Sequence, residues 1–325
     1  MRPFAYERAA DAAGAVALLN GADGARYLAG GTNLVDLMKL EVETPGLLVD
    51  VRDVGTEIEE TAAGGLRIGA GVTNGALAAD RRVRERYPLL AQAVLAGASG
   101  QLRNLATVGG NLLQRTRCAY FQDVTKPCNK RRAGSGCPAR QGEHRNLAVL
   151  GHSQACVATH PSDMAVALAA LGATVHVTGS GGDRAIPIPG LHRLPGDEPQ
   201  RDTVLEPGEL IVAVELEAPV MVERARYRKV RDRASYAFAV VSVAVAVELD
   251  GGTVGDCRIA FGGLAHVPWR ADRAEAVLRG ATAGEAVFRD AADAELAAAE
   301  PLRDNAFKVP LARNVLVSTL EEVCS

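Results

Sequence analysis

The spacing of apolar residues near the start of the chain predicts a small βαβ unit. Apolar positions recur at helical spacing in residues 11–20, and the short apolar run at 25–28 is typical of a strand. Residues 34–40 again have a helical pattern, and 47–51 form a second apolar run. A strand, a helix and a second strand in this order make the unit complete.

Further along, the pattern predicts a larger region in which strands and helices are mixed. The expected elements, in chain order, are 66–70, 74–79, 89–95, 164–171 and 210–216. The first and last of these are strands, and the others are helices. Residues 179–207 are rich in glycine, proline and charge, which predicts a long connection without regular structure.

Beyond residue 219, strands come first and helices follow. The expected strands are 226–230, 240–249 and 254–261, and the expected helices are 274–278, 284–299 and 311–323. Asp250-Gly251-Gly252 is predicted to be a hairpin turn. Antiparallel strands followed by helices are typical of a separate α+β domain, here from about residue 220.

Composition and charge exclude several classes of protein. The 325 residues are 48% hydrophobic and 4% aromatic, so the chain can bury a substantial aliphatic core. A net charge of −3 gives no global field that would attract nucleic acid or an anionic membrane. The longest apolar run, 237–247, is shorter than the roughly 20 residues that span a bilayer. Residues 1–28 contain no apolar signal segment, so we expect a cytoplasmic chain without membrane insertion.

A glycine pair follows the first predicted strand. In Ala29-Gly30-Gly31-Thr32-Asn33-Leu34, a backbone without side chains can approach a ligand closely. Free N–H groups at such a turn suit a pyrophosphate. The motif matches neither the P-loop nor the G-x-G-x-x-G fingerprint, and a plain tight turn also explains it.

A second glycine turn lies about 80 residues later in the chain. Thr107-Val108-Gly109-Gly110-Asn111 brings a hydroxyl, two glycines and an amide into one turn, which suits a phosphate or a polar ring edge. Two turns of this kind favour a ligand site over two unrelated tight turns.

Four of the six cysteines fall in a 39-residue stretch that is also rich in glycine, proline, arginine and lysine. They are Cys118, Cys128, Cys137 and Cys156. The intervals between them are nine, eight and eighteen residues, which is too wide for the paired C-x-x-C knuckles of common zinc sites. An irregular loop can gather four thiolates around an iron–sulfur cluster or zinc at any spacing, so the spacing does not identify the metal. Two disulfides or four unrelated thiols are the alternatives, and Cys257 and Cys324 are predicted to be ordinary thiols.

Six basic residues lie in the same loop and could offset the negative charge of a thiolate-bound cluster, face a partner, or simply be solvated. They are Lys126, Lys130, Arg131, Arg132, Arg140 and Arg145. A polar segment, Thr159-His160-Pro161-Ser162-Asp163, follows the last cysteine, and Ser162 or Asp163 is predicted to cap the next helix. His160 either reaches a ligand or satisfies the turn.

Together these motifs resemble the FAD-binding subunit of the molybdenum hydroxylases, the xanthine dehydrogenase family, over essentially the whole chain. The two glycine turns resemble the flavin turns of that family, and the segment from Tyr227 through Phe261-Gly262-Gly263-Leu264-Ala265 is similar to its C-terminal domain. One branch, which includes periplasmic aldehyde oxidoreductases, carries a [4Fe–4S] cluster after the second flavin turn. The stretch from Arg115-Thr116-Arg117-Cys118 through Cys156 to Asp163 is similar to that branch.

The resemblance implies an α+β fold in which two N-terminal subdomains hold FAD and a C-terminal α+β domain helps to cover it. The FAD-binding domain would span 1–219, with subdomains at about 1–55 and 56–219. An iron–sulfur loop would occupy 115–160, and the C-terminal flavoprotein domain would span 220–325.

Roles for single residues follow from the same resemblance. The segment from Ala29 to Leu34 would hold the pyrophosphate through its N–H groups, and Lys229 would stabilise the anionic reduced flavin. Further cofactor contacts are implied for Thr107, Gly110, Asn111, His160, Ser162 and Asp163, the last on a ribose hydroxyl. The four cysteines of the loop, Cys118, Cys128, Cys137 and Cys156, would bind one [4Fe–4S] cluster.

The implied function is electron transfer within a heterotrimer. A large molybdopterin-binding subunit would oxidise the substrate, a small subunit would carry [2Fe–2S] centres, and this chain would pass electrons through FAD to an external acceptor. No side chain of this chain is then expected to act as acid, base or nucleophile, and periplasmic export would depend on a partner. The alternatives are the flavin subunit of an aromatic-CoA reductase, a free-standing flavin oxidase and a zinc-stabilised binding module.

Overall fold

The computed structural model describes residues 1–325, and the N-terminal part forms a three-stranded parallel sheet in the order β1-β3-β2. Its elements are β1 (Ala5–Arg8), α1 (Ala12–Asn20), β2 (Arg26–Leu28), α2 (Leu34–Lys39) and β3 (Leu47–Asp50). The predicted βαβ unit is confirmed as β2, α2 and β3. The sequence pattern does not predict β1, because all four of its residues are exposed.

The second sheet has five antiparallel strands in the order β4-β5-β8-β6-β7. The strands are β4 (Ile58–Glu60), β5 (Leu66–Gly69), β6 (Thr174–Gly179), β7 (Gly182–Pro187) and β8 (Leu210–Leu216). The helices of this central region are α3 (Asn74–Ala79), α4 (Arg81–Arg86), α5 (Pro88–Ala96), α6 (Gly100–Arg103), α7 (Val108–Leu112), α8 (Ala119–Gln122), a 3-10 turn (Pro138–Arg140), α9 (Asp163–Leu171) and α10 (Ile188–Leu191). The strands of this sheet pack with α5 and α9 in one aliphatic core.

The prediction that 179–207 is an irregular connection is wrong in part. Gly182–Pro187 forms β7, which pairs with β6, and Ile188–Leu191 forms α10. Strand β7 lies at the edge of the sheet, and five of its six residues are exposed. It therefore lacks the apolar alternation by which a strand is recognised in a sequence.

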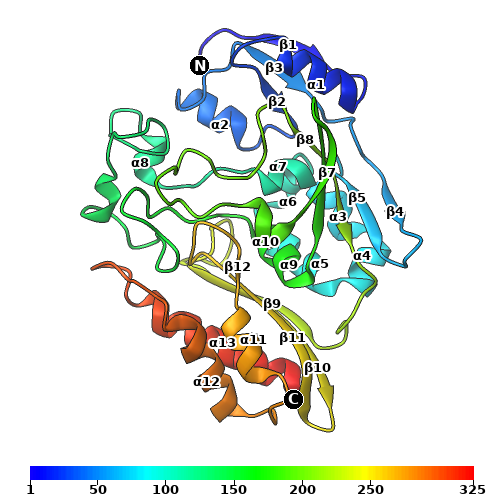
Figure 1. Ribbon diagram of the computed structural model, residues 1–325, viewed down its shortest axis with the longest axis vertical. Helices are drawn as coiled ribbons and strands as arrows, with labels where there is room; N and C mark the ends of the chain where they lie inside the picture. Colours follow the sequence, from blue (N-terminus) through cyan, green and yellow to red (C-terminus); the bar gives the residue numbers. More distant parts are fainter.

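The third sheet is antiparallel, in the order β12-β11-β10-β9, and has C-terminal helices packed against it (Figure 1). Its elements are β9 (Ala225–Val230), β10 (Val241–Asp250), β11 (Thr253–Gly262), β12 (Trp269–Arg270), α11 (Asp272–Leu278), α12 (Glu285–Leu296) and α13 (Lys308–Cys324). Along β10, valines such as Val243 and Val245 belong to the core of the C-terminal helices. Ala244 and Ala246, on the other face, belong to the core of α5 and α9.

The fold is therefore α+β, as the sequence predicts. Small alanine side chains on one face of β10 let the third sheet pack closely against the central region. None of the helices combines the length and the apolar character needed to cross a bilayer.

A buried lysine joins helix α13 to two distant segments. Lys308 is 0% exposed and has no carboxylate partner; its Nζ donates to the carbonyl oxygens of Leu147, at 2.9 Å, and of Gly263. Burial, together with the positive charge of Arg145, lowers the pKa of Lys308 to about 7. Carbonyl contacts alone therefore hold this ammonium group.

We expect Lys308 to make the stability of the protein rise with pH. Its pKa is about 7 in the folded protein, against an ordinary value of 10.5, so between these values the unfolded chain binds one more proton. The free energy of unfolding should then increase by at most about 1.4 kcal/mol per pH unit across this window. Urea titrations between about pH 7 and 9 measure the slope. Wild type should have a steeper positive slope than Lys308→Met, and equal slopes would contradict the prediction.

Candidate functional site

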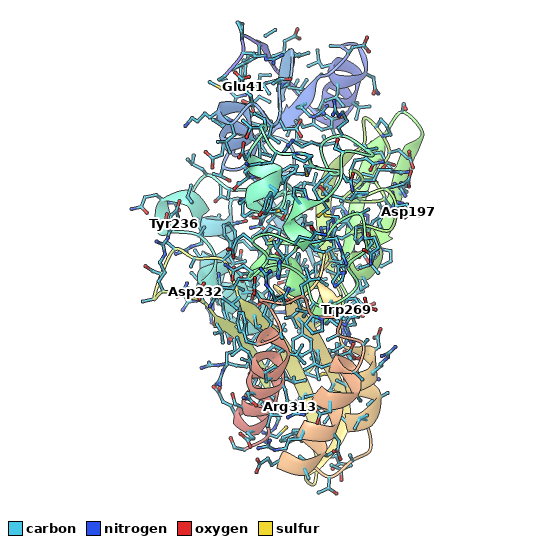
Figure 2. The ribbon with its side chains drawn as sticks, turned by 90° about the vertical axis from the view of Figure 1, so that its left-hand side faces the viewer. Glu41, Asp197, Asp232, Tyr236, Trp269 and Arg313 are labelled. Carbon is cyan, nitrogen blue, oxygen red and sulfur yellow. The ribbon has the colours of Figure 1, made fainter.

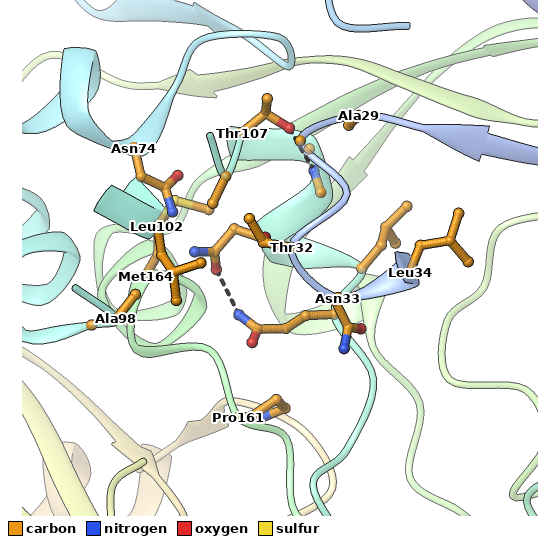
Figure 3. Close-up of a pocket in the computed structure, with 18 of the residues that line it drawn as sticks. Ala29, Thr32, Asn33, Leu34, Asn74, Ala98, Leu102, Thr107, Pro161 and Met164 are labelled. Atoms are coloured by element: carbon orange, nitrogen blue, oxygen red, sulfur yellow. Dashed lines mark hydrogen bonds between the residues drawn. The ribbon is translucent and has the colours of Figure 1, made fainter. Parts of the chain in front are cut away.

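A cavity of about 750 Å³, here called the large cavity, lies between the first sheet, the helices of the central region and the connection from β9 to β10. The turn from β2 to α2 forms one of its walls. Figure 3 shows Asn33 and Leu34 of this turn on one side and Asn74, Leu102 and Met164 on the other. The cavity is thus built from segments that are far apart in the sequence.

The first glycine turn presents a row of unpaired backbone donors. None of the N–H groups from Gly30 to Leu34 donates a hydrogen bond to another group of the protein, although all five residues line the large cavity. Gly31 has a φ of 71°, a conformation that glycine adopts without strain. Successive N–H groups without protein acceptors form a concave anion-binding turn.

The two glycine turns touch each other at Gly30. A Cβ atom on this residue would lie 1.9 Å from the carbonyl oxygen of Leu105, in the segment that leads into the second turn. Any side chain at position 30 would therefore push the two walls of the cavity apart. The sequence motif shows the glycine, but only the fold shows what it contacts.

The second glycine turn differs from the first because its own backbone donors are satisfied. Thr107 caps helix α7 by accepting a hydrogen bond from Gly110 N at 3.3 Å, and the N–H of Gly109 donates to Ala70 O at 2.9 Å. Side chains provide the polar groups instead. Asn111 Oδ1 accepts hydrogen bonds from Ser162 Oγ and, at 3.0 Å, from Gln114 Nε2. The amide nitrogen of Asn111 is then the donor that this turn offers to a ligand.

A buried ion pair joins the start of α9 to strand β9 at the wall of the large cavity. Lys229 Nζ lies 2.8 Å from Asp163 Oδ2, and the two side chains are 4% and 7% exposed. Tyr227 Oη donates to the other carboxylate oxygen at 2.6 Å. Burial, and then the charge of Asp163, raises the pKa of Tyr227 well above its ordinary value, so this hydroxyl keeps its proton.

The structure brings most of the predicted cofactor residues together around the large cavity. Those that line it are Ala29, Gly30, Gly31, Thr32, Asn33, Leu34, Thr107, Gly110, Asn111, Asp163 and Lys229. Ser162 and His160 do not line it. Ser162 caps helix α9 by accepting from Ala165 N at 2.9 Å, and its hydroxyl positions Asn111.

His160 packs against another histidine. Its ring centroid is 4.2 Å from that of His192, and burial, together with His192, lowers the pKa of His160 well below its ordinary value. The ring is therefore neutral. The structure decides neither of the two interpretations that the sequence leaves open for His160, because its Nε2 atom has no hydrogen-bond partner in the turn.

Other residues of the large cavity carry no recognisable sequence signal. Asn74, which caps no helix and is 3% exposed, lines the cavity, and its Oδ1 atom is buried without a hydrogen-bond partner. Tyr236 and Phe238, in the connection from β9 to β10, line the cavity and are 56% and 48% exposed. Figure 2 shows Tyr236 and Asp232 at one edge of the molecule. The cavity therefore meets solvent at this connection.

The four cysteines of the basic loop surround one small cavity, here called the cysteine cavity. Cys118 and Cys156 are buried, Cys128 and Cys137 are half-buried, and all four line this cavity together with Lys130. All four are free thiols in the structure. No group of three or more such side chains is arranged to hold a single metal ion. The thiols thus lie around a common space rather than around one point.

Burial raises the pKa of Cys118 and Cys137, and it raises that of Cys156 to about 12. Backbone N–H groups act in the opposite sense: those of Phe121 and Tyr120 face the Cys118 thiol and favour its thiolate form. Similar N–H groups face Cys137 and Cys156. Donors directed at buried sulfur atoms are typical of sites that bind thiolate-held clusters.

A third cavity, of about 300 Å³, lies between the other two. Cys118 lines both it and the cysteine cavity, whereas Asp163 and Arg117 line both it and the large cavity. Burial lowers the pKa of Arg117 to about 10, and its guanidinium lies 4.8 Å from the ring centre of Phe238. The cysteine cavity and the large cavity are therefore neighbours, although their residues lie on separate segments.

Two family models together match nearly the whole chain. Residues 2–219 match the FAD binding domain in molybdopterin dehydrogenase, and residues 225–323 match the CO dehydrogenase flavoprotein C-terminal domain.

Curated relatives and solved structures agree with these matches. The chain is 52% identical over 324 residues to the aldehyde oxidoreductase FAD-binding subunit PaoB of Escherichia coli (strain K12), covering 99% of this chain and 98% of that one. It is 28% identical to the carbon monoxide dehydrogenase medium chain of Afipia carboxidovorans, covering 92% and 86%. Its structure resembles a chain of reconstituted CO dehydrogenase from Oligotropha carboxidovorans with a TM-score of 0.78, at 25% identity and with 99% and 98% of the two chains covered.

Proposed function

The chain belongs to the family of FAD-binding subunits of the molybdenum hydroxylases, and from this premise we propose that it carries FAD and a [4Fe–4S] cluster in a heterotrimeric aldehyde oxidoreductase. The observation that carries this proposal is the arrangement of four thiols around one cavity beside a much larger cavity lined by both glycine turns. Residues 1–219 would form the FAD-binding domain and 220–325 the C-terminal flavoprotein domain.

The residues of the large cavity fit FAD. A pyrophosphate needs several N–H donors, and the row from Gly30 to Leu34 has no acceptor within the protein. Asn74 Oδ1, which lacks a partner, supplies an acceptor for a donor of the ligand. When bound, FAD supplies the exchange between two-electron and one-electron transfer. Lys229 would hold a positive charge near the flavin ring, with Asp163 and Tyr227 fixing its position.

The residues of the cysteine cavity fit an iron–sulfur cluster. Four soft thiols share one cavity, and backbone N–H groups face several of them. A cluster places its own iron and sulfide between its ligands, so the thiols need to surround a space rather than meet at one ion. When bound, the cluster supplies one-electron transfer or a structural anchor for the loop.

The proposed partners are a large molybdopterin-binding subunit and a small [2Fe–2S] subunit. The chain would receive electrons from these partners and pass them to an external acceptor, which could approach at the exposed side chains of Tyr236 and Phe238. The aldehyde class of substrate is proposed from the 52% identity to an aldehyde oxidoreductase subunit. The flavin subunit of an aromatic-CoA reductase is the alternative within the same family.

We expect this chain to oxidise no aldehyde by itself. Expressed alone, it should contain FAD, iron and sulfide but show no aldehyde turnover, because its cavities provide no molybdenum site. Expressed with its neighbouring subunits, it should purify as a complex that contains molybdenum and oxidises aldehydes. Absorption spectra, metal and sulfide analysis and an aldehyde assay with an artificial acceptor measure these quantities on both preparations. Robust aldehyde turnover by the single chain would rule out the subunit role. A preparation that contains flavin but no iron would show that the chain binds no iron–sulfur cluster.

A further inference from the structure

A fully buried lysine lies beside the four cysteines. The Lys130 side chain is 1% exposed and lines the cysteine cavity. Its Nζ forms an ion pair with Asp202, donates to Pro199 O at 2.8 Å and lies 2.8 Å from His266 Nε2. These partners come from the connection between α10 and β8 and from the C-terminal region. The ammonium group is thus fixed in place from several sides.

His266 accepts a hydrogen bond from Lys130 and is neutral. Its other ring nitrogen, Nδ1, lies 3.1 Å from Ala158 O and donates to that carbonyl, which leaves Nε2 as the acceptor for Lys130. Burial lowers the pKa of His266, which favours this neutral form. The charge of Lys130 is therefore not shared with a second cation at this ring.

The cations and carboxylates around Lys130 balance in the interior, but Lys130 is the charged residue of this network that lines the cysteine cavity. Asp202 is shared between Lys130 and Arg115, whose Nε lies 2.5 Å from Asp202 Oδ2. Arg115 also pairs with Glu43 at 3.0 Å, and Glu43 is shared in turn with Arg26 at 3.4 Å. Arg26 is 52% exposed, so in the interior two cations, Lys130 and Arg115, face two carboxylates. Lys130 lines the cysteine cavity and neither carboxylate does, so the positive end of this network faces the cysteines.

The other basic residues of the loop lie differently. Lys126, Arg132 and Arg145 are exposed, so water screens their charge. Arg131 and Arg140 are half-buried and donate to backbone carbonyls, such as Phe121 O at 2.6 Å and Ser153 O at 2.9 Å. None of these five lines the cysteine cavity. Of the six basic residues of the loop, Lys130 is therefore the one that is buried beside the cysteines.

We propose that Lys130 is the positioning residue whose fixed positive charge raises the reduction potential of the cluster held by Cys118, Cys128, Cys137 and Cys156. This inference rests on the proposed function, because it requires the cluster. An added electron increases the negative charge of a thiolate-bound cluster, and a buried cation beside it favours the reduced state. Screening is weak in the interior, so the effect of Lys130 exceeds that of any exposed cation in the loop.

The test compares Lys130→Met with Lys126→Met in the purified complex. Both variants remove one positive charge from the same loop, but Lys126 is exposed. An anaerobic redox titration followed by electron paramagnetic resonance gives the midpoint potential of the cluster. Lys130→Met should shift this potential downward, whereas Lys126→Met and the charge-retaining Lys130→Arg should leave it close to wild type. An unchanged potential in Lys130→Met, or an equal shift in Lys126→Met, would overturn the proposal.

A second variant covers the case in which Lys130→Met fails to assemble the cluster. Asp202→Asn removes the carboxylate that partly neutralises Lys130, so the midpoint potential should shift upward. An unchanged or lowered potential in this variant would refute the role of Lys130. Iron and acid-labile sulfide are measured on every sample. A wild-type complex without them would refute the cluster itself, whereas a normal cluster with unshifted potentials would refute Lys130 alone.

Discussion

Replacing Gly30 with alanine is expected to weaken FAD binding by roughly 5- to 150-fold. The added methyl group would lie 1.9 Å from Leu105 O, a backbone atom that cannot turn away as a side chain can. Relieving such a contact in a packed interior costs about 1–3 kcal/mol, and each 1.4 kcal/mol is tenfold in affinity. The displacement would also move the N–H donors of the first turn away from the second turn. Flavin content after purification, and titration of FAD into the apoprotein, measure the loss.

The control for this prediction is Gly46→Ala. No atom lies within 4 Å of a Cβ built on Gly46, which precedes strand β3 in the same small sheet. This variant should keep its full flavin content and the same unfolding midpoint as wild type. If Gly30→Ala retained wild-type affinity for FAD, the contact between the two turns would not define the cofactor site.

The glycine turns can be found from the sequence because their function depends on the backbone. A row of free N–H groups and a close approach both require small residues at set positions, and Gly30 and Gly31 stand where the strand-to-helix pattern predicts them. The sequence does not indicate that the two turns use different donors. The backbone donors of the second turn already have acceptors within the protein. The N–H of Gly110 donates to the Thr107 side chain, and the N–H of Gly109 donates to Ala70 O. Asn111 thus acts through its side chain.

The sequence shows less clearly which charged residues contribute to a site than which glycines do. Lys130 and Lys126 are four positions apart in one basic loop, and no local pattern distinguishes the buried ammonium from the solvated one. The difference arises from Asp202 and His266, which are distant in sequence and come close only in the folded chain. Asn74 is a similar case, since its unpaired amide oxygen becomes meaningful only once a cavity lies beside it.

Edge strands are the other gap between sequence and structure. Strands β1 and β7 are almost entirely exposed, so their residues alternate in direction without alternating in polarity. Buried strands such as β10 agree with the prediction to within one residue at each end, because continuous apolar character marks a strand covered on both faces. Burial alone does not decide which strands are predicted, however: the interior strand β6 is absent from the prediction, whereas β2, which has no buried residue, is predicted.

Each of the four loop cysteines is expected to be required for the iron–sulfur cluster. A serine at position 118, 128, 137 or 156 leaves one iron with a poor ligand and open to solvent and oxygen. Cys118→Ser, Cys128→Ser, Cys137→Ser and Cys156→Ser should therefore each lose most of their iron and acid-labile sulfide. The loop should also lose its anchor and become sensitive to protease at Gly134 and Gly136, which have positive φ angles and open space where a Cβ atom would lie.

The remaining two cysteines serve as matched controls, because the structure places them away from the cysteine cavity. Cys257 is fully buried in the C-terminal core, with its Sγ 3.8 Å from Glu275 O, and Cys324 ends helix α13. Cys257→Ser and Cys324→Ser should keep the wild-type iron and sulfide content, even if Cys257→Ser lowers the stability of the core. Iron, zinc and sulfide assays on anaerobically prepared protein decide between the outcomes. Zinc in the wild type, or iron that depends on Cys257 but not on Cys128, would disprove the cluster while leaving FAD binding untouched.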